Sequence, residues 1–290
     1  MNTKYLIIGA LLCASAASAQ SPVSGFMNQK GKGAVVVSYS SEKYNEVFLV
    51  PEKVNGVPIF NEVQNTSVNL YATYGLSNKL EMVLGLPYIQ SKGQGEENFM
   101  KANNFSNSRS GLQDLSFFLK YKLISTKIGS ASLDVLATAG IQTPLGSYKV
   151  DEGLQSIIAI GNRSTKFTPM GIVHLKTESG LFATGQLGYS LRNNRVPNAV
   201  VSELKAGYAG SKVYLDAWVA RQTSVSGTDI LQSGFDGFFP ATRVNYTRVG
   251  ANIFAPIAGG IGAVVGVNSY LEGRNLGKST GFSVGLVLNY

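Results

Sequence analysis

The chain has 290 residues, a formal net charge of +8, one cysteine and one histidine, and 14% of its residues are charged. These counts exclude an intramolecular disulfide and leave too few soft ligands for an ordinary transition-metal site. No run of about 18 apolar residues follows the first twenty positions, which excludes a transmembrane helix but not transmembrane strands, whose polar and apolar residues alternate.

Residues 1–19 have the features of a secretory signal peptide. Lys4 precedes an apolar run, and Ala17-Ser18-Ala19 then forms an Ala-x-Ala site, so we expect cleavage before Gln20. The only cysteine, Cys13, lies inside the apolar run and is preceded by Leu12, whereas a lipoprotein signal needs a small residue there. The mature chain would then have 24 basic and 17 acidic residues, a net charge of +7, and no thiol.

The rest of the chain predicts strands almost throughout. Residues 20–32 are polar and rich in glycine, and we expect them to form a periplasmic N-terminal tail. About twelve segments then alternate large apolar residues with small or polar ones, which is typical of strands with one apolar face. The expected strands are 33–40, 63–75, 79–91, 113–124, 129–143, 166–178, 180–192, 199–209, 211–225, 241–257, 259–273 and 281–290.

The connections between these segments alternate in length along the whole chain. Short connections, such as 75–79 and 178–180, separate longer ones, such as 41–62 and 92–112. Outer-membrane barrels show this asymmetry, with short periplasmic turns and long extracellular loops. We therefore predict one all-β domain over residues 33–290, a single transmembrane antiparallel up-and-down β-barrel in the outer membrane of a Gram-negative bacterium, with both termini in the periplasm.

The final segment, 281–290, supports this fold. Its large residues alternate with small ones, and the chain ends on an aromatic residue. The segment resembles the C-terminal signal that the barrel-assembly machinery reads in outer-membrane proteins, and an edge strand of a soluble sandwich is the alternative. The residues expected to carry the assembly signal are Phe282, Leu286, Leu288 and Tyr290.

Strand parity predicts which side chains face the lumen, since charges of both signs are costly in lipid. The candidates for lining the lumen are Glu81, Asp114, Phe118, Lys120, Lys122, Asp134, Lys176, Arg192, Lys205, Asp216, Trp218 and Arg248. The same parity places Glu203 and Glu272 inward. These residues either line a polar path or only fill and rigidify the barrel.

Pro87 interrupts a strand whose flanks alternate cleanly. It cannot donate a ladder hydrogen bond, and Gly85 beside it has no side chain. Gly85 and Pro87 are therefore candidates for a lateral exit through the wall. The alternative is that Pro87 only ends the strand near the outer rim.

Several short motifs resemble the meta-pathway phenol-degradation family of outer-membrane barrels. The matching segments are Tyr74-Gly75-Leu76-Ser77-Asn78-Lys79-Leu80-Glu81, Gly85-Leu86-Pro87-Tyr88, Ser110-Gly111-Leu112-Gln113-Asp114-Leu115, Lys120-Tyr121-Lys122-Leu123 and Gln142-Thr143-Pro144-Leu145-Gly146. Gln113 departs from the family pattern, which usually has glycine before the aspartate. The resemblance implies a channel for small, often aromatic or hydrophobic molecules.

No catalytic constellation is recognisable in the sequence. His174, the only histidine, is expected on the lumen side. Glu96 with Glu97, or Asp229 with Asp236, could hold calcium, although solvated loop charges are the simpler interpretation. We therefore expect a non-enzymatic passive channel without a cofactor. The expected partners are outer-membrane lipid, lipopolysaccharide, the barrel-assembly machinery and a small solute, and not nucleic acid. A structural or adhesive barrel and a lipid-modifying barrel enzyme are the two alternatives.

Overall fold

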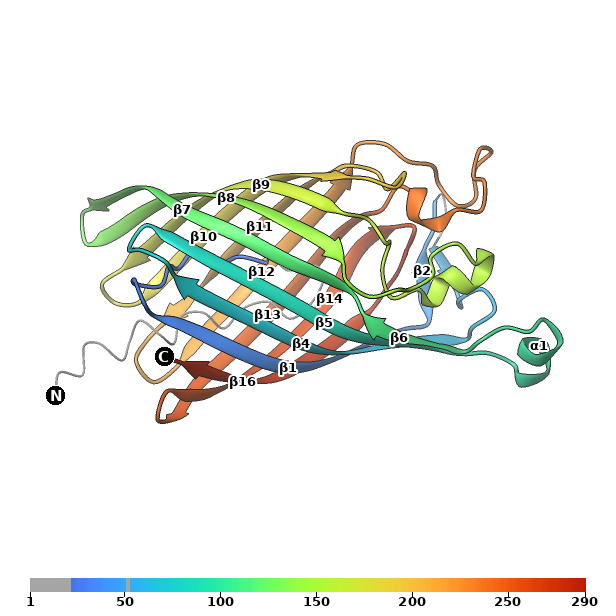
Figure 1. Ribbon diagram of the computed structural model, residues 1–290, viewed down its shortest axis with the longest axis horizontal. Coiled ribbons are helices and arrows are strands. Elements are labelled where there is room, and N and C mark those ends of the chain that lie inside the picture. The colour runs from blue at the N-terminus through green and yellow to red at the C-terminus, as the bar shows by residue number, and fades with distance from the viewer. Residues whose placement is uncertain (1–21, 51–52) are drawn as a thin grey trace.

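A computed structural model describes residues 22–50 and 53–290 of the chain, so the expected signal peptide at 1–19 lies outside the described residues. The described chain forms one large antiparallel sheet that closes on itself (Figure 1). Its strands are β1 (Gly33–Tyr44), β4 (Glu62–Gly75), β5 (Leu80–Gln94), β6 (Ser108–Leu112), β7 (Asp114–Ile128), β8 (Ala131–Pro144), β9 (Lys166–Thr177), β10 (Leu181–Arg192), β11 (Ala199–Ala209), β12 (Tyr214–Ser224), β13 (Asn245–Ala258), β14 (Ile261–Arg274) and β16 (Thr280–Asn289).

These thirteen strands occupy twelve positions around the barrel, because β6 and β7 follow one another along the same neighbour, β5. The barrel is closed by β1, which pairs with β16 on one side and with β4 on the other. Closure leaves no exposed sheet edge, which is a requirement for a sheet in lipid. The prediction of an up-and-down barrel with about twelve strands is confirmed.

The two ends of the barrel differ, as the loop lengths predicted. One end, here called the turn end, has tight connections such as the one between β9 and β10. The other, here called the loop end, carries a small sheet of β2 (Glu46–Phe48), β3 (Lys53–Asn55) and β15 (Leu276–Gly277). It also carries α1 (Glu97–Ala102) and the short 3-10 helices η3 (Gly153–Ile158) and η4 (Phe239–Ala241) (Figure 1).

Alternation along each strand separates two chemically different faces. In β12 every second residue from Tyr214 to Ser224 is buried and the residues between them are exposed. The exposed positions elsewhere are mostly aliphatic: Leu187, Leu204 and Leu286 are 61%, 65% and 59% exposed. An apolar outer face and a polar inner face are what a barrel needs in a bilayer.

The N-terminal segment does not form the free tail that its composition suggested. Val23 and Phe26 are 0% and 6% exposed, and both belong to the core cluster inside the barrel. Gly33, which follows this segment, pairs with the last residue, since Gly33 N donates to Tyr290 O and Tyr290 N donates to Gly33 O. The expectation of a periplasmic tail at 20–32 is therefore wrong for the buried residues, because backbone and aromatic contacts hold them in the lumen.

Glu272 is a second departure from the predicted pattern. The pairing of β13 with β14 shifts between Thr247 and Arg248, so Leu271 is the extra residue of a bulge. Beyond the bulge Glu272 is exposed, and it accepts a hydrogen bond from Thr247 Oγ1 at 3.1 Å. A bulge reverses the parity of all residues that follow it, and this reversal places Glu272 on the outer face.

Candidate functional site

The structure places all twelve candidate lumen residues on the inner side of their strands. The buried ones are Glu81, Asp114, Phe118, Lys120, Lys205, Asp216, Trp218 and Arg248. The half-buried ones are Lys122, Asp134, Lys176 and Arg192. They do not form one site, because they divide into a closed layer near the turn end and two open cavities toward the loop end.

A buried ion pair anchors the N-terminal segment near the turn end. Glu81 of β5 and Lys120 of β7 are both fully buried, with Lys120 Nζ 2.7 Å from Glu81 Oε1. Lys120 Nζ also donates to Ser24 O at 2.9 Å and Phe26 O at 2.5 Å, and the Asn28 N–H donates to Glu81 Oε2 at 2.5 Å. Two hydrogen bonds to plug carbonyls and the ion pair with Glu81 therefore offset the cost of burying the Lys120 charge.

Aromatic side chains complete this closed layer. The Phe26 ring lies edge-on to His174 and to Phe182, with centroid distances of 4.2 and 5.0 Å, and Phe182 stacks on Tyr214 at 5.5 Å. Lys176 Nζ is 5.6 Å from the centre of the Phe26 ring. Edge-on and stacked pairs each add stabilisation beyond burial. The N-terminal segment is therefore held as a plug, defined here as residues 22–28, by contacts with strands on several sides of the lumen.

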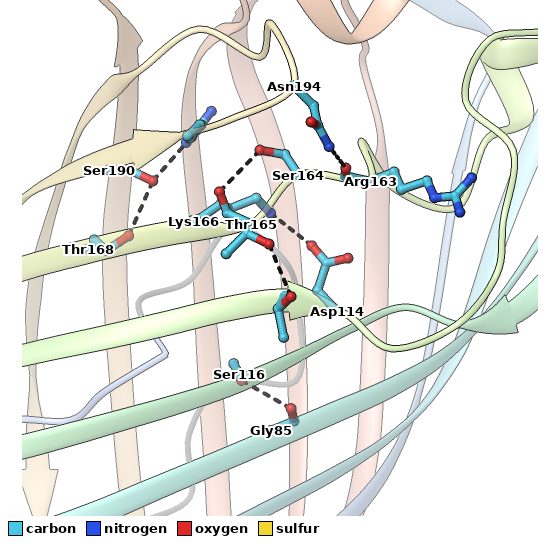
Figure 2. A network of polar contacts seen from close by, with 12 residues as sticks. Gly85, Asp114, Ser116, Arg163, Ser164, Thr165, Lys166, Thr168, Ser190 and Asn194 are labelled. Atoms are coloured by element: carbon cyan, nitrogen blue, oxygen red, sulfur yellow. Dashed lines mark hydrogen bonds and ion pairs between the residues drawn. The ribbon is translucent and has the colours of Figure 1, made fainter.

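A polar network lines the inner wall at the loop end (Figure 2). Lys166 Nζ lies 3.1 Å from Asp114 Oδ2, and the Tyr148 hydroxyl donates to Asp114 Oδ1 at 2.5 Å. Burial and the hydrogen bond to Asp114 both raise the pKa of the Tyr148 phenol, so it stays protonated and remains a donor. These bonds fix the loop between β8 and β9 against the barrel wall.

Arginine side chains face the same region. Arg192 Nη2 donates to Gln222 Oε1 at 2.7 Å, and Arg192 Nε donates to Ser190 Oγ at 3.1 Å. Arg248 is paired with Glu42 and lies over the Tyr270 ring, with the guanidinium carbon 4.7 Å from its centroid. Planar guanidinium groups suit such stacked and forked contacts.

Two cavities occupy the lumen above the plug. One of about 230 Å³ reaches down to Pro22 and Phe118, and the other, of about 430 Å³, lies nearer the loop end and is lined by Glu42 and Arg248. The residues that line both cavities, and so mark the passage between them, are Gln113, Lys166, Arg192, Gln222 and Tyr246.

The smaller of these cavities extends to the barrel wall at the glycine and proline that the sequence indicated as a lateral exit. Its lining includes Gly85 and Pro87, and also Leu70 and Leu86, whose parity is that of the outer face. The β5–β7 ladder ends at Gly85, and the β5–β6 ladder begins at Tyr88. The strand pairing of the wall is therefore interrupted where the cavity meets it.

Two hydrogen bonds link β5 to its neighbour across this interruption, one from a backbone N–H and one from a side chain. Gln113 N donates to Pro87 O at 3.0 Å, and Ser116 Oγ donates to Gly85 O at 3.1 Å, the second of which is visible in Figure 2. Between the two ladders, β5 has two residues, 86 and 87, whereas the neighbouring strand has three, 113–115. The extra residue makes this a bulge, and Gln113 is its first member. Gln113 is also where the sequence departs from the family pattern.

The sequence missed three contributors to the lumen. The plug was overlooked because a polar, glycine-rich segment has no strand periodicity. Tyr148 lies in a long loop and Glu42 lies beyond the end of the expected strand 33–40, so strand alternation did not predict that either faces the lumen. Only Val23, Phe26 and Met27, the three apolar residues in a polar stretch, could have hinted at burial.

The other candidates for chemistry are engaged in structural contacts. Asp229 binds Arg274 and Asn275, and Asp236 is paired with Arg195, so the two carboxylates do not converge on one ion. Across residues 22–50 and 53–290 no group of three or more His, Cys, Asp or Glu side chains could hold a metal. His174 lies in the closed layer, where its Nδ1 is 2.8 Å from Thr184 Oγ1.

Residues 53–286 match the model of the family described as "Putative MetA-pathway of phenol degradation". The chain belongs to this family. No curated protein matches the sequence. The resemblance seen in the short motifs is thus confirmed over most of the barrel.

Solved structures share the fold at low sequence identity. An outer membrane channel from Pseudomonas putida F1 is 14% identical, with a TM-score of 0.72 over 91% of this chain and 97% of that one. The translocator domain of the autotransporter NalP from Neisseria meningitidis is 11% identical, with a TM-score of 0.45 over 91% and 90% of the two chains. Outer membrane phospholipase A from Escherichia coli is 12% identical, with a TM-score of 0.42 over 98% and 97%. The first similarity supports the barrel fold.

Proposed function

We propose that this protein is an outer-membrane channel for the passive uptake of small hydrophobic or aromatic solutes. Family membership and the barrel fold support this assignment, and the Pseudomonas putida protein with the same fold is itself described as an outer membrane channel. The turn end faces the periplasm and the loop end the cell exterior, as in other barrels of this kind. The role is transport, and no catalytic step is part of it.

The observation that carries the proposal is the pair of connected cavities above a closed layer. A solute that enters from the loop end meets open space of about 430 Å³ and then about 230 Å³. It next meets the plug, where the buried Phe26 fills the lumen and packs against His174 and Phe182. A route straight through the lumen is therefore blocked in this conformation.

The side exit at Gly85 and Pro87 offers the solute another route. The inner cavity touches these residues and the outward-facing Leu70 and Leu86. An apolar molecule that passes between β5 and β7 reaches the hydrocarbon of the bilayer, where transfer from water is favourable. It thereby crosses the polar lipopolysaccharide layer inside the protein.

The proposal includes the lipid contacts and the assembly route. Exposed aliphatic side chains would contact the acyl chains. Phe282, Leu286, Leu288 and Tyr290 would be read by the barrel-assembly machinery, and all four are exposed. The Tyr290 ring also stacks on Tyr74 with a centroid distance of 6.4 Å, beside the closing β1–β16 pair.

Closing the side exit tests the route. In the variant Gly85→Ala/Pro87→Val, a methyl group at position 85 meets Ser116 Oγ, and valine restores a ladder donor. Proteoliposomes that carry lipopolysaccharide in the outer leaflet and this variant should take up toluene at least several-fold more slowly than those with wild type, while flux of a small sugar stays unchanged.

The chain supplies a matched control in β9, where Pro169 and Gly171 have the same spacing on the outer face. The variant Pro169→Val/Gly171→Ala should keep wild-type toluene uptake. If the Gly85/Pro87 variant also keeps it, the side exit is wrong. If wild type does not accelerate toluene entry over protein-free liposomes, the channel function is wrong.

A further inference from the structure

A third cavity lies at the loop end of the barrel, among the extracellular loops. It has a volume of about 340 Å³ and is enclosed by the connections that follow β1, β8, β12 and β14. We call it the loop cavity. Part of its wall is a packed core, since Val47 and Val57 are 9% and 7% exposed and belong to a second hydrophobic cluster with the fully buried Ile158.

The lining of the loop cavity is mainly apolar and carries no charged side chain. Its side chains are mainly aliphatic, with Phe239 and Pro240 on one side, and no Asp, Glu, Lys, Arg or His is among them. The Asn275 amide in the lining already donates to Asp229 Oδ1 and to Arg243 O, both at 2.8 Å. A charged ligand would lose its water here without gaining a counter-charge, so the cavity favours a neutral, mainly apolar ligand.

The size of the loop cavity narrows the class of ligand. An apolar cavity of roughly 150 Å³ is large enough to bind benzene. The loop cavity, at about 340 Å³, is about twice as large and falls within the usual range of small-molecule sites. It therefore fits a ligand of about two fused aromatic rings.

The loop cavity lies between the cell exterior and the lumen. Leu154 and Leu231 belong to its lining and are 45% and 59% exposed, so they mark its mouth toward solvent. Tyr44, Phe239 and Thr242 line both the loop cavity and the adjoining 430 Å³ cavity of the lumen. A ligand bound in the loop cavity is therefore next to the lumen cavity of the channel.

Ionic contacts hold the loops around the cavity in place. Arg274 donates to Asp229 through Nε at 2.7 Å and Nη2 at 2.6 Å, which joins the β12–β13 loop to the end of β14. The Tyr44 hydroxyl donates to Ile157 O at 3.5 Å, which joins β1 to η3. A cavity held open before binding loses less entropy when a ligand enters.

We infer that the loop cavity is a binding site for a neutral aromatic hydrocarbon of about two fused rings, which it captures before transfer to the lumen. This inference rests on the proposed channel function and adds a recognition step to it. The site selects against charged aromatics, although the lumen beyond it carries charges of both signs.

Methyl NMR in lipid nanodiscs tests the site with naphthalene as the probe and 2-naphthoate as its charged counterpart. The nanodiscs contain no lipopolysaccharide, so no lipid A acyl chain competes. Naphthalene should shift the methyl signals of Leu154, Ile157 and Leu231 saturably, through ring currents. Lipid-facing methyls such as those of Leu204 report non-saturating partition into the bilayer. 2-Naphthoate should leave the three loop signals unchanged.

Two variants and one control make the test specific. Ala159→Phe fills the loop cavity, and Leu231→Asp places a charge at its mouth, so each should weaken naphthalene binding at least tenfold. Phe99→Asp changes a residue in α1 that is 43% exposed and does not line the loop cavity, and it should bind as wild type does.

Failure of this inference can be separated from failure of the channel function. Loop methyl signals that do not respond to naphthalene, or that respond equally to 2-naphthoate, overturn the binding site even if proteoliposomes still conduct hydrocarbons. Saturable binding that Ala159→Phe abolishes supports the site even if no flux is measured, and the channel function would then be the part that fails.

Discussion

The pair of Glu81 and Lys120 shows how one buried contact can hold a distant segment of the chain. Both side chains are 0% exposed, and the partners of Lys120 include two backbone carbonyls from the plug. A buried ion pair stabilises the folded state little more than apolar residues of similar size at the same positions would. Removing only one partner, however, leaves a buried charge without a counter-charge. The contact is therefore better understood as an anchor for residues 22–28 than as a general source of stability.

Replacing only one member of this ion pair should destabilise the barrel more than replacing both members with apolar residues. Lys120→Met leaves Glu81 buried without a counter-charge, and the free energy of unfolding should fall by about 3–5 kcal/mol. The double variant Glu81→Leu/Lys120→Met should recover at least half of that loss. Guanidinium unfolding followed through Trp218, the only tryptophan, measures both. Lys127→Met, at an exposed position of the same strand, is the control, and equal losses in the single and double variants would contradict the argument.

At the scale of elements, the strands were far more predictable than the loops. Period-two alternation gave the inner and outer faces of nearly every strand, because a side chain in a barrel wall has only two directions. Glu272 was misplaced because a bulge has no signal in the alternation before it. Asp229 was considered with Asp236 for calcium because both carboxylates lie in one loop. Its actual partner, Arg274, is 45 residues away, and no local pattern connects the two.

The pH dependence of the loop end follows from the Asp229 contact. Hydrogen bonds from Arg274 hold the pKa of the Asp229 carboxyl below its ordinary range, although burial opposes this effect. Because this pKa is lowered, the ionised Asp229 stabilises the folded loops fully at pH values above the unfolded-state pKa of about 3.9. That stabilisation is lost as the pH falls through the folded-state pKa. The loops should therefore keep their structure from pH 7 to pH 5 and loosen below about pH 4.

Substitutions at Asp229 and Asp236 separate this contact from surface charge effects. At pH 6, Asp229→Asn should raise the population of the open loop about tenfold, or ~1.4 kcal/mol, as seen in the methyl signals of Ile230 and Leu231. Asp236→Asn should change it little, because the Arg195–Asp236 pair is 62% and 51% exposed and such pairs contribute little. The difference between wild type and Asp229→Asn should vanish below the folded pKa of Asp229, and a difference that persists at that pH would be inconsistent with titration of this carboxyl.

For the molecule as a whole, the plug and the irregular wall are two parts of one arrangement. The sequence predicted the wall feature, since Pro87 and Gly85 are visible in a strand pattern. It could not predict the plug, because the contacts that bury Phe26 come from His174 and Tyr214. These residues lie more than 140 positions away in the sequence, and only the fold brings them together with Phe26. With the plug in place, the open space of the lumen ends beside the irregular wall and not at the periplasm.

Loosening the plug should convert a side-opening channel into a through-pore. In Val23→Gly/Phe26→Gly the plug loses its two buried apolar anchors, 0% and 6% exposed in the wild type, while the length of the chain and the region that precedes it are kept. Burial of side chains this large stabilises by roughly 1.5–3 kcal/mol each, enough to hold a short segment in place or to release it. Planar-bilayer conductance and sugar flux should then rise several-fold, because ions and polar solutes gain a route through the turn end. Toluene uptake should change little, since the wall at Gly85 and Pro87 is untouched.

Met27→Ala, at a half-buried position of the same segment, serves as the control and should conduct as wild type does. Conductance that stays at the wild-type level in Val23→Gly/Phe26→Gly would mean that residues 22–28 do not limit passage through the lumen, and a parallel rise in toluene uptake would mean that hydrocarbons also leave through the turn end.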